Sequence, residues 1–371
     1  MSTAQTVFEP RELLAGHEIE RPLVAGGVRC HGGFDSEGRY VSPRTKNRIP
    51  AIEAWQEQQR RLFGTELLDI GLDAWPAAWP NVEQARFLLR HGIRQPIVTE
   101  LTRIGTVEGF GALIRFTPMP DWRKCVVEDI AGTATAHLAS GLYEAHARDE
   151  AGYESEGGHQ QMWFAARDVA FEHPVTEDQT AAMLERIGLA RPGQGSGGID
   201  TEVVARQFEE RRLFRDLPWE LEMLIDRMIR LLLIEISAFH VFAWAEKLLA
   251  DPDLVAGEGE AARLVSYIRS DETPHVEYLK TSLSELRDRT FIGDSGKRRP
   301  GAEVVGRMWD RGVSESLNVR RRDGLIASLA EVTHALEGRS DKDDLLAEFH
   351  SLGDIQPGPR GEWPPPVSPP E

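Results

Sequence analysis

Apolar residues recur at helical spacing through most of the chain. Segments with this pattern cover residues 49–62, 82–91, 96–114, 122–142, 143–171, 218–250, 260–289 and 323–336. Before them, residues 24–48 alternate short apolar runs with glycine and charged residues, and Asp35-Ser36-Glu37-Gly38 is typical of a hairpin turn. We therefore predict a mainly α protein with a short, hairpin-like lead-in.

Composition restricts the class of protein. The 371 residues are 41% hydrophobic and 28% charged, enough to bury a sizeable core, and the net charge of −17 disfavours nucleic acid and anionic lipid as partners. Cys30 and Cys125 are too few for a disulfide scaffold and are not spaced as a zinc site. Residues 1–30 lack a basic segment followed by an apolar run. We expect a soluble, cytoplasmic protein that binds neither nucleic acid nor membrane.

One glutamate lies in the most apolar predicted helix. Glu235 is flanked by leucine, isoleucine and phenylalanine on nearly every face. A buried carboxylate costs several kcal/mol unless it is paired, protonated or bound to a metal. Three interpretations of Glu235 remain open. It forms a salt bridge with Arg227 or Arg230, it is protonated, or it is a metal ligand.

The sequence Glu-x-x-His occurs three times. The pairs are Glu156/His159, Glu272/His275 and Glu331/His334. The second pair falls on the apolar stripe of its predicted helix and points to the core, whereas the third falls off its stripe and is set aside as solvent-facing. The first pair shares a face with Trp163. Two inward pairs and one buried glutamate therefore remain.

These residue types form most of the ligand set of a dinuclear metal centre. Carboxylates bridge and neutralise two divalent ions, each ion takes an imidazole, and residues i and i+3 on a helix converge on one ion. In a four-helix bundle, two helices each give a Glu and the other two each give Glu-x-x-His. One glutamate is still required.

With these residues the chain resembles the ferritin-like diiron-carboxylate superfamily, which includes ribonucleotide reductase small subunits, bacterial multicomponent monooxygenases, acyl-carrier-protein desaturases, arylamine N-oxygenases and rubrerythrins. The family order is Glu, Glu-x-x-His, Glu, Glu-x-x-His, matched by a first-helix acid, then Glu156/His159, Glu235 and Glu272/His275. The resemblance implies a ferritin-like four-helix bundle holding two iron ions, or one manganese and one iron. It also implies that Asp271 hydrogen-bonds the ligand His159.

Chain length suggests the missing acid. Ligands on antiparallel helices lie at equal distances from the connecting turn, at about 1.5 Å per residue. Glu128 and Glu156 are equidistant from Leu142, just after a plausible helix stop, so Glu128 is the first choice. Glu144, with a turn at Gly152, is the alternative.

Two features depart from the family pattern. Gly157-Gly158 loosens the first Glu-x-x-His, and Pro274 inside the second removes a backbone donor and predicts a kink or bulge. Either feature widens the metal cavity, or the glycines leave Glu156 outside a helix. The nearby histidines His137, His146 and His240 are interpreted as structural.

The resemblance implies a domain organisation. We expect an N-terminal extension packed on the bundle (1–100), a ferritin-like metal-binding bundle (101–292), C-terminal helices (293–352) and a disordered Pro-rich tail (353–371). These additions exceed what a bare iron-storage bundle needs, which favours a pocket for an organic substrate.

The implied activity is that of an O2-activating non-haem diiron oxidoreductase, a monooxygenase, N-oxygenase or desaturase, acting on a small organic substrate. The sequence has no flavin or nicotinamide fingerprint, so electrons are expected from an external ferredoxin or reductase. A metal-oxidising or peroxide-scavenging ferritin-like protein and a non-enzymatic helical interaction protein are the alternatives. A homodimer is left open.

Overall fold

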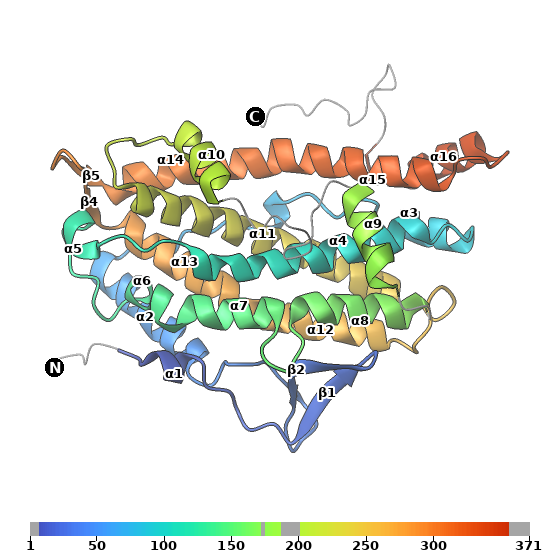
Figure 1. Cartoon of the computed structure of the whole chain (residues 1–371), viewed down its shortest axis with the longest axis horizontal. Helices are drawn as coiled ribbons and strands as arrows, with labels where there is room; N and C mark the ends of the chain where they lie inside the picture. The colour runs from blue at the N-terminus through green and yellow to red at the C-terminus, as the bar shows by residue number, and fades with distance from the viewer. Residues whose placement is uncertain (1–6, 172–174, 187–200, 356–371) are drawn as a thin grey trace.

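Helices make up most of the structure, and the long ones lie side by side along the long axis of the molecule (Figure 1). The structure is a computed structural model that describes residues 7–171, 175–186 and 201–355. The prediction of a mainly α protein is confirmed. The predicted Pro-rich tail lies, from residue 356, outside the described residues.

The elements follow one another in this order. The first half of the chain has α1 (Pro10–Leu13), β1 (Arg21–Ala25), β2 (Val28–Phe34), β3 (Tyr40–Val41), α2 (Arg48–Phe63), η1 (Leu72–Ala74), α3 (Val82–Arg90), α4 (Gln95–Gly111), η2 (Ala112–Phe116), α5 (Trp122–Cys125), α6 (Ala134–His137), the π-helical turn η3 (Leu138–Leu142), α7 (Tyr143–Ala151), α8 (His159–Phe171) and α9 (Glu177–Arg186). The second half has α10 (Thr201–Arg211), α11 (Trp219–Leu249), α12 (Glu260–Asp271), α13 (Thr273–Arg287), β4 (Thr290–Ile292), β5 (Arg298–Pro300), α14 (Gly301–Ser314), the π-helical turn η4 (Glu315–Arg320), α15 (Arg321–Ala335) and α16 (Lys342–Ser351).

Four helical segments, which we call the central helices, pack against one another. They are α4, the pair α7 and α8, α11, and the pair α12 and α13. α4 contacts α7 and α8, α12 contacts α8 and α11, and α13 contacts α11. α11 is apolar on nearly all faces, as expected for a helix surrounded by others.

The apolar interior consists of two clusters of buried side chains. On α11, Ile236 belongs to the first cluster and Phe242 to the second. The α12–α13 pair has Val276 in the first and Ile268 in the second. Buried polar residues of both segments lie at the boundary between the clusters. This boundary is the site described below.

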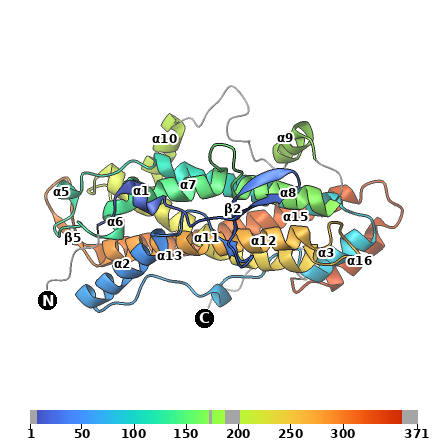
Figure 2. The same ribbon diagram turned by 90° about the horizontal axis from the view of Figure 1, so that it is seen from below.

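A small antiparallel sheet covers one face of the central helices (Figures 1 and 2). Strands β1 and β2 are joined at Gly26-Gly27, whose φ angles of 54° and 77° suit the tight two-residue turn. The pairing of Phe34 with Tyr40 confirms the predicted hairpin at residues 35–38. Strand β2 packs on α8 and carries His31 into the interior.

The predicted helix over residues 122–142 is wrong. Only α5 and α6 are α-helical there, and the segment between them pairs with β4, where Val127 N donates to Thr290 O over 2.9 Å. After α6 comes η3, in which Gly141 has a φ of 142°. Hydrogen bonding to a distant strand has replaced local helix formation.

Two other helices are interrupted. The helix predicted over 143–171 is divided into α7 and α8 by a loop at residues 152–158. The predicted kink at Pro274 is confirmed, because α12 ends at Asp271 and α13 begins at Thr273 with the proline in its first turn. Glu272 occupies the junction.

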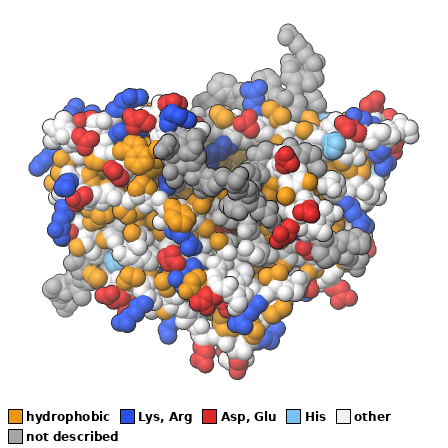
Figure 3. All heavy atoms as spheres, in the orientation of Figure 1, with side chains coloured by type: hydrophobic (Ala, Val, Ile, Leu, Met, Phe, Trp, Pro, Cys, Tyr) orange, Lys and Arg blue, Asp and Glu red, His pale blue; other side chains and the backbone are white. Residues whose placement is uncertain are grey.

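Helix α11 is long and apolar enough to cross a membrane, and half of the residues in its most apolar window are buried in the protein. The core helix of a soluble protein meets the same criteria, so α11 alone does not establish a membrane span. The face drawn in Figure 3 carries acidic and basic side chains intermixed with apolar ones. On this face the net negative charge is therefore not gathered into one acidic patch.

Candidate metal centre

Six buried side chains meet where the central helices come together. They are His146 and Glu150 on α7, His159 on α8, Glu235 on α11, Glu272 at the α12–α13 junction and His275 on α13. One group contains His146, Glu150, Glu235 and His275, and a second contains Glu150, His159, Glu272 and His275, with the candidate ligand atoms of each group within 4.8 Å of one another. Because Glu150 and His275 belong to both groups, the two groups are adjacent.

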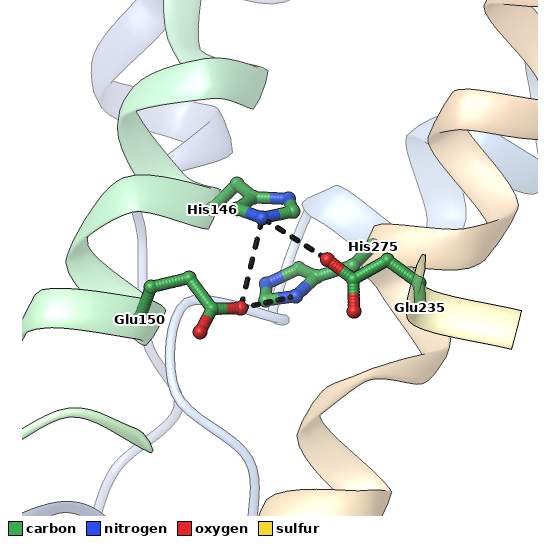
Figure 4. Close-up of side chains that lie close together, drawn as sticks. All are labelled: His146, Glu150, Glu235 and His275. Carbon is green, nitrogen blue, oxygen red and sulfur yellow. Dashed lines mark ion pairs between the residues drawn. The ribbon is translucent and has the colours of Figure 1, made fainter. Parts of the chain in front are cut away.

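Glu150 is the common neighbour of the three histidines. Its Oε1 lies 3.6 Å from His146 Nε2, 3.4 Å from His159 Nδ1 and 3.3 Å from His275 Nδ1. Figure 4 shows the first group, in which Glu235 Oε1 lies 3.4 Å from His146 Nε2. In the second group, Glu272 contacts His159 Nδ1 at 2.8 Å and His275 Nδ1 at 2.7 Å.

A fourth acid approaches from α4. Glu108 Oε2 lies 3.9 Å from His159 Nδ1, and the Glu108 side chain is 10% exposed. Each of the four central helices therefore contributes one glutamate to the centre.

The four carboxylates have no basic counter-charge apart from imidazole. In the described part of the chain, their ion-pair partners are all histidines. Burial, together with repulsion from the neighbouring carboxylates, raises the pKa of both Glu108 and Glu235. Without a cation, protonation is therefore what neutralises these two acids.

The histidines show the complementary effect. Burial lowers the pKa of His159 and His275, but the Glu272 carboxylate beside both rings outweighs it and the pKa of each rises. Burial likewise opposes ionisation of Glu272, and the two imidazoles overcome it and lower its pKa. Burial and the stacked ring of His275, 3.9 Å away between centroids, lower the pKa of His146.

Several atoms that face the centre make no hydrogen bond. They are both carboxylate oxygens of Glu150, Oε1 of Glu272, Nε2 of His146 and Nδ1 of His159. A buried polar atom left in this state costs about 1–3 kcal/mol. Oxygen and imidazole nitrogen are ligands that iron, manganese and other divalent metals accept, so a cation fits this donor set.

Two aspartates lie beside the ring nitrogens of His159 and His275 that face away from the centre. Asp149 Oδ2 lies 3.0 Å from His275 Nε2. Asp271 Oδ2 lies 3.6 Å from Nε2 of His159, the histidine that the resemblance pairs with Asp271. Each aspartate immediately precedes a glutamate of the centre. The Nδ1 atom of each ring is therefore directed to the centre while Nε2 faces a carboxylate.

Asp149 is neutralised from the N-terminal segment. Arg44 Nε donates to Asp149 Oδ1 over 2.7 Å, and Arg48 Nη2 lies 2.7 Å from Oδ2. Burial opposes ionisation of Asp149, but the two guanidinium groups lower its pKa well below the usual value. Asp149 is thus held as a carboxylate.

Asp271 has neutral partners from the same segment. Tyr40 OH donates to Asp271 Oδ2 over 2.7 Å, and His31 Nε2 lies 3.2 Å from the same oxygen. Because Arg44 Nη2 donates to His31 Nδ1, the Nε2 of His31 carries the proton that Asp271 accepts. This supports the orientation of Asp271 toward His159.

Some of the predicted ligands come together and others do not. The structure groups His159, Glu235, Glu272 and His275. Glu156 lies in the loop before α8, with a side chain 38% exposed and 3.4 Å from Arg29, so it lies outside the centre. Glu150, at the end of α7, takes its place. The reason is the interruption of the helix, which places Glu150 and His159 together across a loop.

The two candidates for the first acid also lie elsewhere. Glu128 accepts a hydrogen bond from Thr290 N over 2.8 Å, and Glu144, 34% exposed, accepts one from Arg148 over 2.7 Å. Glu108 is the acid that α4 provides.

Of the three histidines interpreted as structural, His146 lies in the first group of candidate ligands. His137 and His240 contact the backbone oxygens of Thr133 and Leu72. In the Glu-x-x-His pair that was set aside, His334 is exposed but Glu331 is buried.

A sequence signal for the missed residues exists. The dipeptide Asp-Glu occurs twice in the chain, as Asp149-Glu150 and Asp271-Glu272, and both copies lie at the centre. His146 lies one helical turn before Glu150 and hence on the same face.

A tight loop brings Glu150 to His159. A Cβ added to Gly158 would lie 2.4 Å from Asp149 O and 2.8 Å from Glu150 O, so the backbone passes here with no room for a side chain. The glycines that weaken the predicted helix are what permit this close approach.

Comparisons with known protein families, with curated proteins and with solved structures found no match.

Proposed function

We propose that the centre binds two iron ions and that the protein is an O2-activating diiron oxidoreductase with a ferritin-like bundle. The observation that carries this proposal is the set of four buried glutamates, one from each central helix, whose ion-pair partners among the described residues are histidines alone. Two divalent cations would neutralise four carboxylates. The order Glu108, Glu150/His159, Glu235, Glu272/His275 also follows the family order, with a loop between Glu150 and His159.

The two groups of side chains divide the ligands between two positions. His146 and Glu235 would hold an ion at one position and His159 and Glu272 at the other, and Glu150 and His275, which belong to both groups, could serve either position. Iron supplies the redox chemistry with O2 when bound, and manganese in one position is compatible with the same ligands.

The protein's own groups orient the ligands and keep water out. Asp149 accepts a hydrogen bond from His275 Nε2, and the Asp271 carboxylate lies 3.6 Å from His159 Nε2. Both carboxylates favour the orientation in which Nδ1 of each ring faces the metal position. The surrounding apolar clusters provide a dry site in which electrostatic interactions are strong. External ferredoxin or reductase would supply electrons, and we place the protein in the cytoplasm, where free, buried Cys30 and Cys125 stay reduced.

Metal binding is expected to release protons. The apo centre holds protons on Glu108 and Glu235, whose pKa values are raised by burial and neighbouring carboxylates, and on His159 and His275, whose pKa values Glu272 raises against burial. A cation displaces these protons, about two to four per chain, so affinity falls as the pH is lowered. Calorimetric titration with Mn(II) in buffers of different ionisation enthalpy measures the number. A binding enthalpy independent of buffer would contradict this prediction.

Oxygen consumption tests the proposed activity. Protein loaded anaerobically with ferrous iron is expected to take up two ions per chain and, with a chemical reductant and a candidate organic substrate, to consume O2 and form an oxidised product. Glu235→Ala is expected to abolish the reaction. Full iron occupancy without O2 uptake would indicate a structural metal site. O2 uptake with iron oxidation but without an organic product would indicate a metal-oxidising protein. Either result would refute the proposal.

A further inference from the structure

A cavity of about 440 Å³ opens beside the metal centre. Its walls come from α4, α11, η4, α15 and residues 75–80, and Glu108 is among its lining residues. Apolar side chains make up much of the wall, including Ile104, Val107, Val241 and Leu325. Cavities that hold small molecules have volumes of about 300–1,000 Å³, so this one is large enough for an organic ligand.

Two arginines line this cavity without a carboxylate partner. Arg320 and Arg321 are partly buried, and neither forms a salt bridge or a side-chain hydrogen bond within the described residues. Burial lowers the pKa of both side chains, and for Arg320 the nearby Arg230 adds to the effect. Such a pair of desolvated guanidinium groups favours an anionic ligand.

Two neighbouring charged groups, Arg103 and Glu315, form ion pairs with other residues. Arg103, which also lines the cavity, forms an ion pair with Glu100. Glu315, five residues before Arg320, lies 2.8 Å from Arg230. Among the arginines that line the cavity, Arg320 and Arg321 are therefore the two that form no ion pair within the described residues.

The backbone is irregular where these residues meet the cavity. Arg320 ends the π-helical turn η4, between α14 and α15, and Ser316 and Leu317 of the same turn also line the wall. A π-turn within an α-helix is rare and frequently marks a functional site.

We propose that this cavity is the substrate site and that it takes an organic anion with an apolar body, whose carboxylate pairs with Arg320 and Arg321 while the apolar part extends toward Glu108. The proposal rests on the proposed function for the reaction, but the binding it describes does not require turnover. It narrows the substrate to amphipathic carboxylates.

A second cavity near the centre lacks this selectivity. It has a volume of about 730 Å³ and is lined by Gly111, where an added Cβ would lie 2.8 Å from Glu150 Cγ. Its lining arginine, Arg227, donates to Phe116 O and Thr117 Oγ1. The other lining side chains are apolar, so this cavity suits a neutral molecule.

Matched ligand pairs test the proposal. Decanoate and 4-phenylbutyrate, with decanol and 4-phenylbutanol as their neutral counterparts, are titrated anaerobically into the metal-loaded protein, and binding is followed by calorimetry and by the fluorescence of Trp75 and Trp79, which line the cavity. At least one acid is expected to bind about tenfold or more tightly than its alcohol, since charge-assisted hydrogen bonds to arginine distinguish the two.

Variants assign the preference to the two arginines. The double variant Arg320→Gln, Arg321→Gln is expected to lose the tenfold preference and to keep its metal content, whereas Arg227→Gln keeps both. Equal binding of acid and alcohol by the wild type, or an undiminished preference in the double variant, would overturn the proposal. Metal content and O2 uptake are measured separately, so acid-selective binding without O2 chemistry refutes the proposed function alone, and O2 chemistry without acid selectivity refutes this inference alone.

Discussion

Glu150→Ala is expected to reduce the metal bound per chain from two ions to less than one. Glu150 belongs to both groups of candidate ligands, and its Oε1 lies within 3.6 Å of a nitrogen from each of His146, His159 and His275. Removing it takes an anionic ligand from both positions and leaves the remaining carboxylates with too little charge to retain two cations. Elemental analysis of protein loaded anaerobically with ferrous iron measures the change.

Glu156→Ala is the matched control. Glu156 is the glutamate of the Glu-x-x-His sequence, yet its exposed side chain pairs with Arg29 on the surface. Its removal is expected to leave both ions in place. If Glu156→Ala lost the metal and Glu150→Ala retained it, the assignment of Glu150 as a ligand would be wrong. Glu156 of the Glu-x-x-His sequence would then be the ligand.

Arg48→Met is expected to lower the free energy of unfolding by about 3–5 kcal/mol, because it leaves a buried carboxylate without one of its two counter-charges. The side chains of Arg48 and Asp149 are 0% exposed and lie 2.7 Å apart. The arginines keep the pKa of Asp149 below its usual value despite burial, so their stabilising effect is present above the pKa of an unfolded aspartate and is lost as the pH falls. The difference between variant and wild type in urea denaturation is therefore expected to shrink toward acid pH.

Arg60→Met is the control for this stability measurement. Arg60 pairs with Glu57 on the surface, and the two side chains are 50% and 69% exposed. A pair of this kind contributes about 0–1 kcal/mol. Equal losses for Arg48→Met and Arg60→Met would show that the buried pair has no special role.

The apolar pattern was sufficient to predict three residues of the centre. Glu235 and the pair Glu272/His275 lie on helix faces that are otherwise apolar, and burial of such a face is decided by residues within the same helix. Pro274 also predicted the break at which Glu272 is placed, because a proline excludes a helix interior for local steric reasons.

Glu150 and Glu108 required the tertiary structure. The spacing Glu-x-x-His presumes a continuous helix, whereas Glu150 and His159 meet across a loop that leaves the helix and returns. Glu108 lies on a helix that the pattern does predict, but only the packing of α4 against α8 brings its carboxylate to His159. The equal-length argument for Glu128 failed because its helix does not form.

Local sequence patterns also do not predict the residues that contact Asp149 and Asp271. The residues that support the two aspartates come from a segment more than 100 residues before Asp149 and reach them by long-range packing. They are His31, Tyr40, Arg44 and Arg48. Nothing in the spacing of residues along one helix encodes such contacts. The repeated Asp-Glu dipeptide is a sequence feature that marks both halves of the centre.

Anomalous X-ray diffraction at the iron edge, from crystals loaded anaerobically with ferrous iron, tests the central claim most directly. Two peaks about 3.5–4 Å apart are expected, with Glu150 between them, His146 and Glu235 at one and His159 and Glu272 at the other. No peak at this position, or a single ion bound without Glu150, would contradict a dinuclear centre.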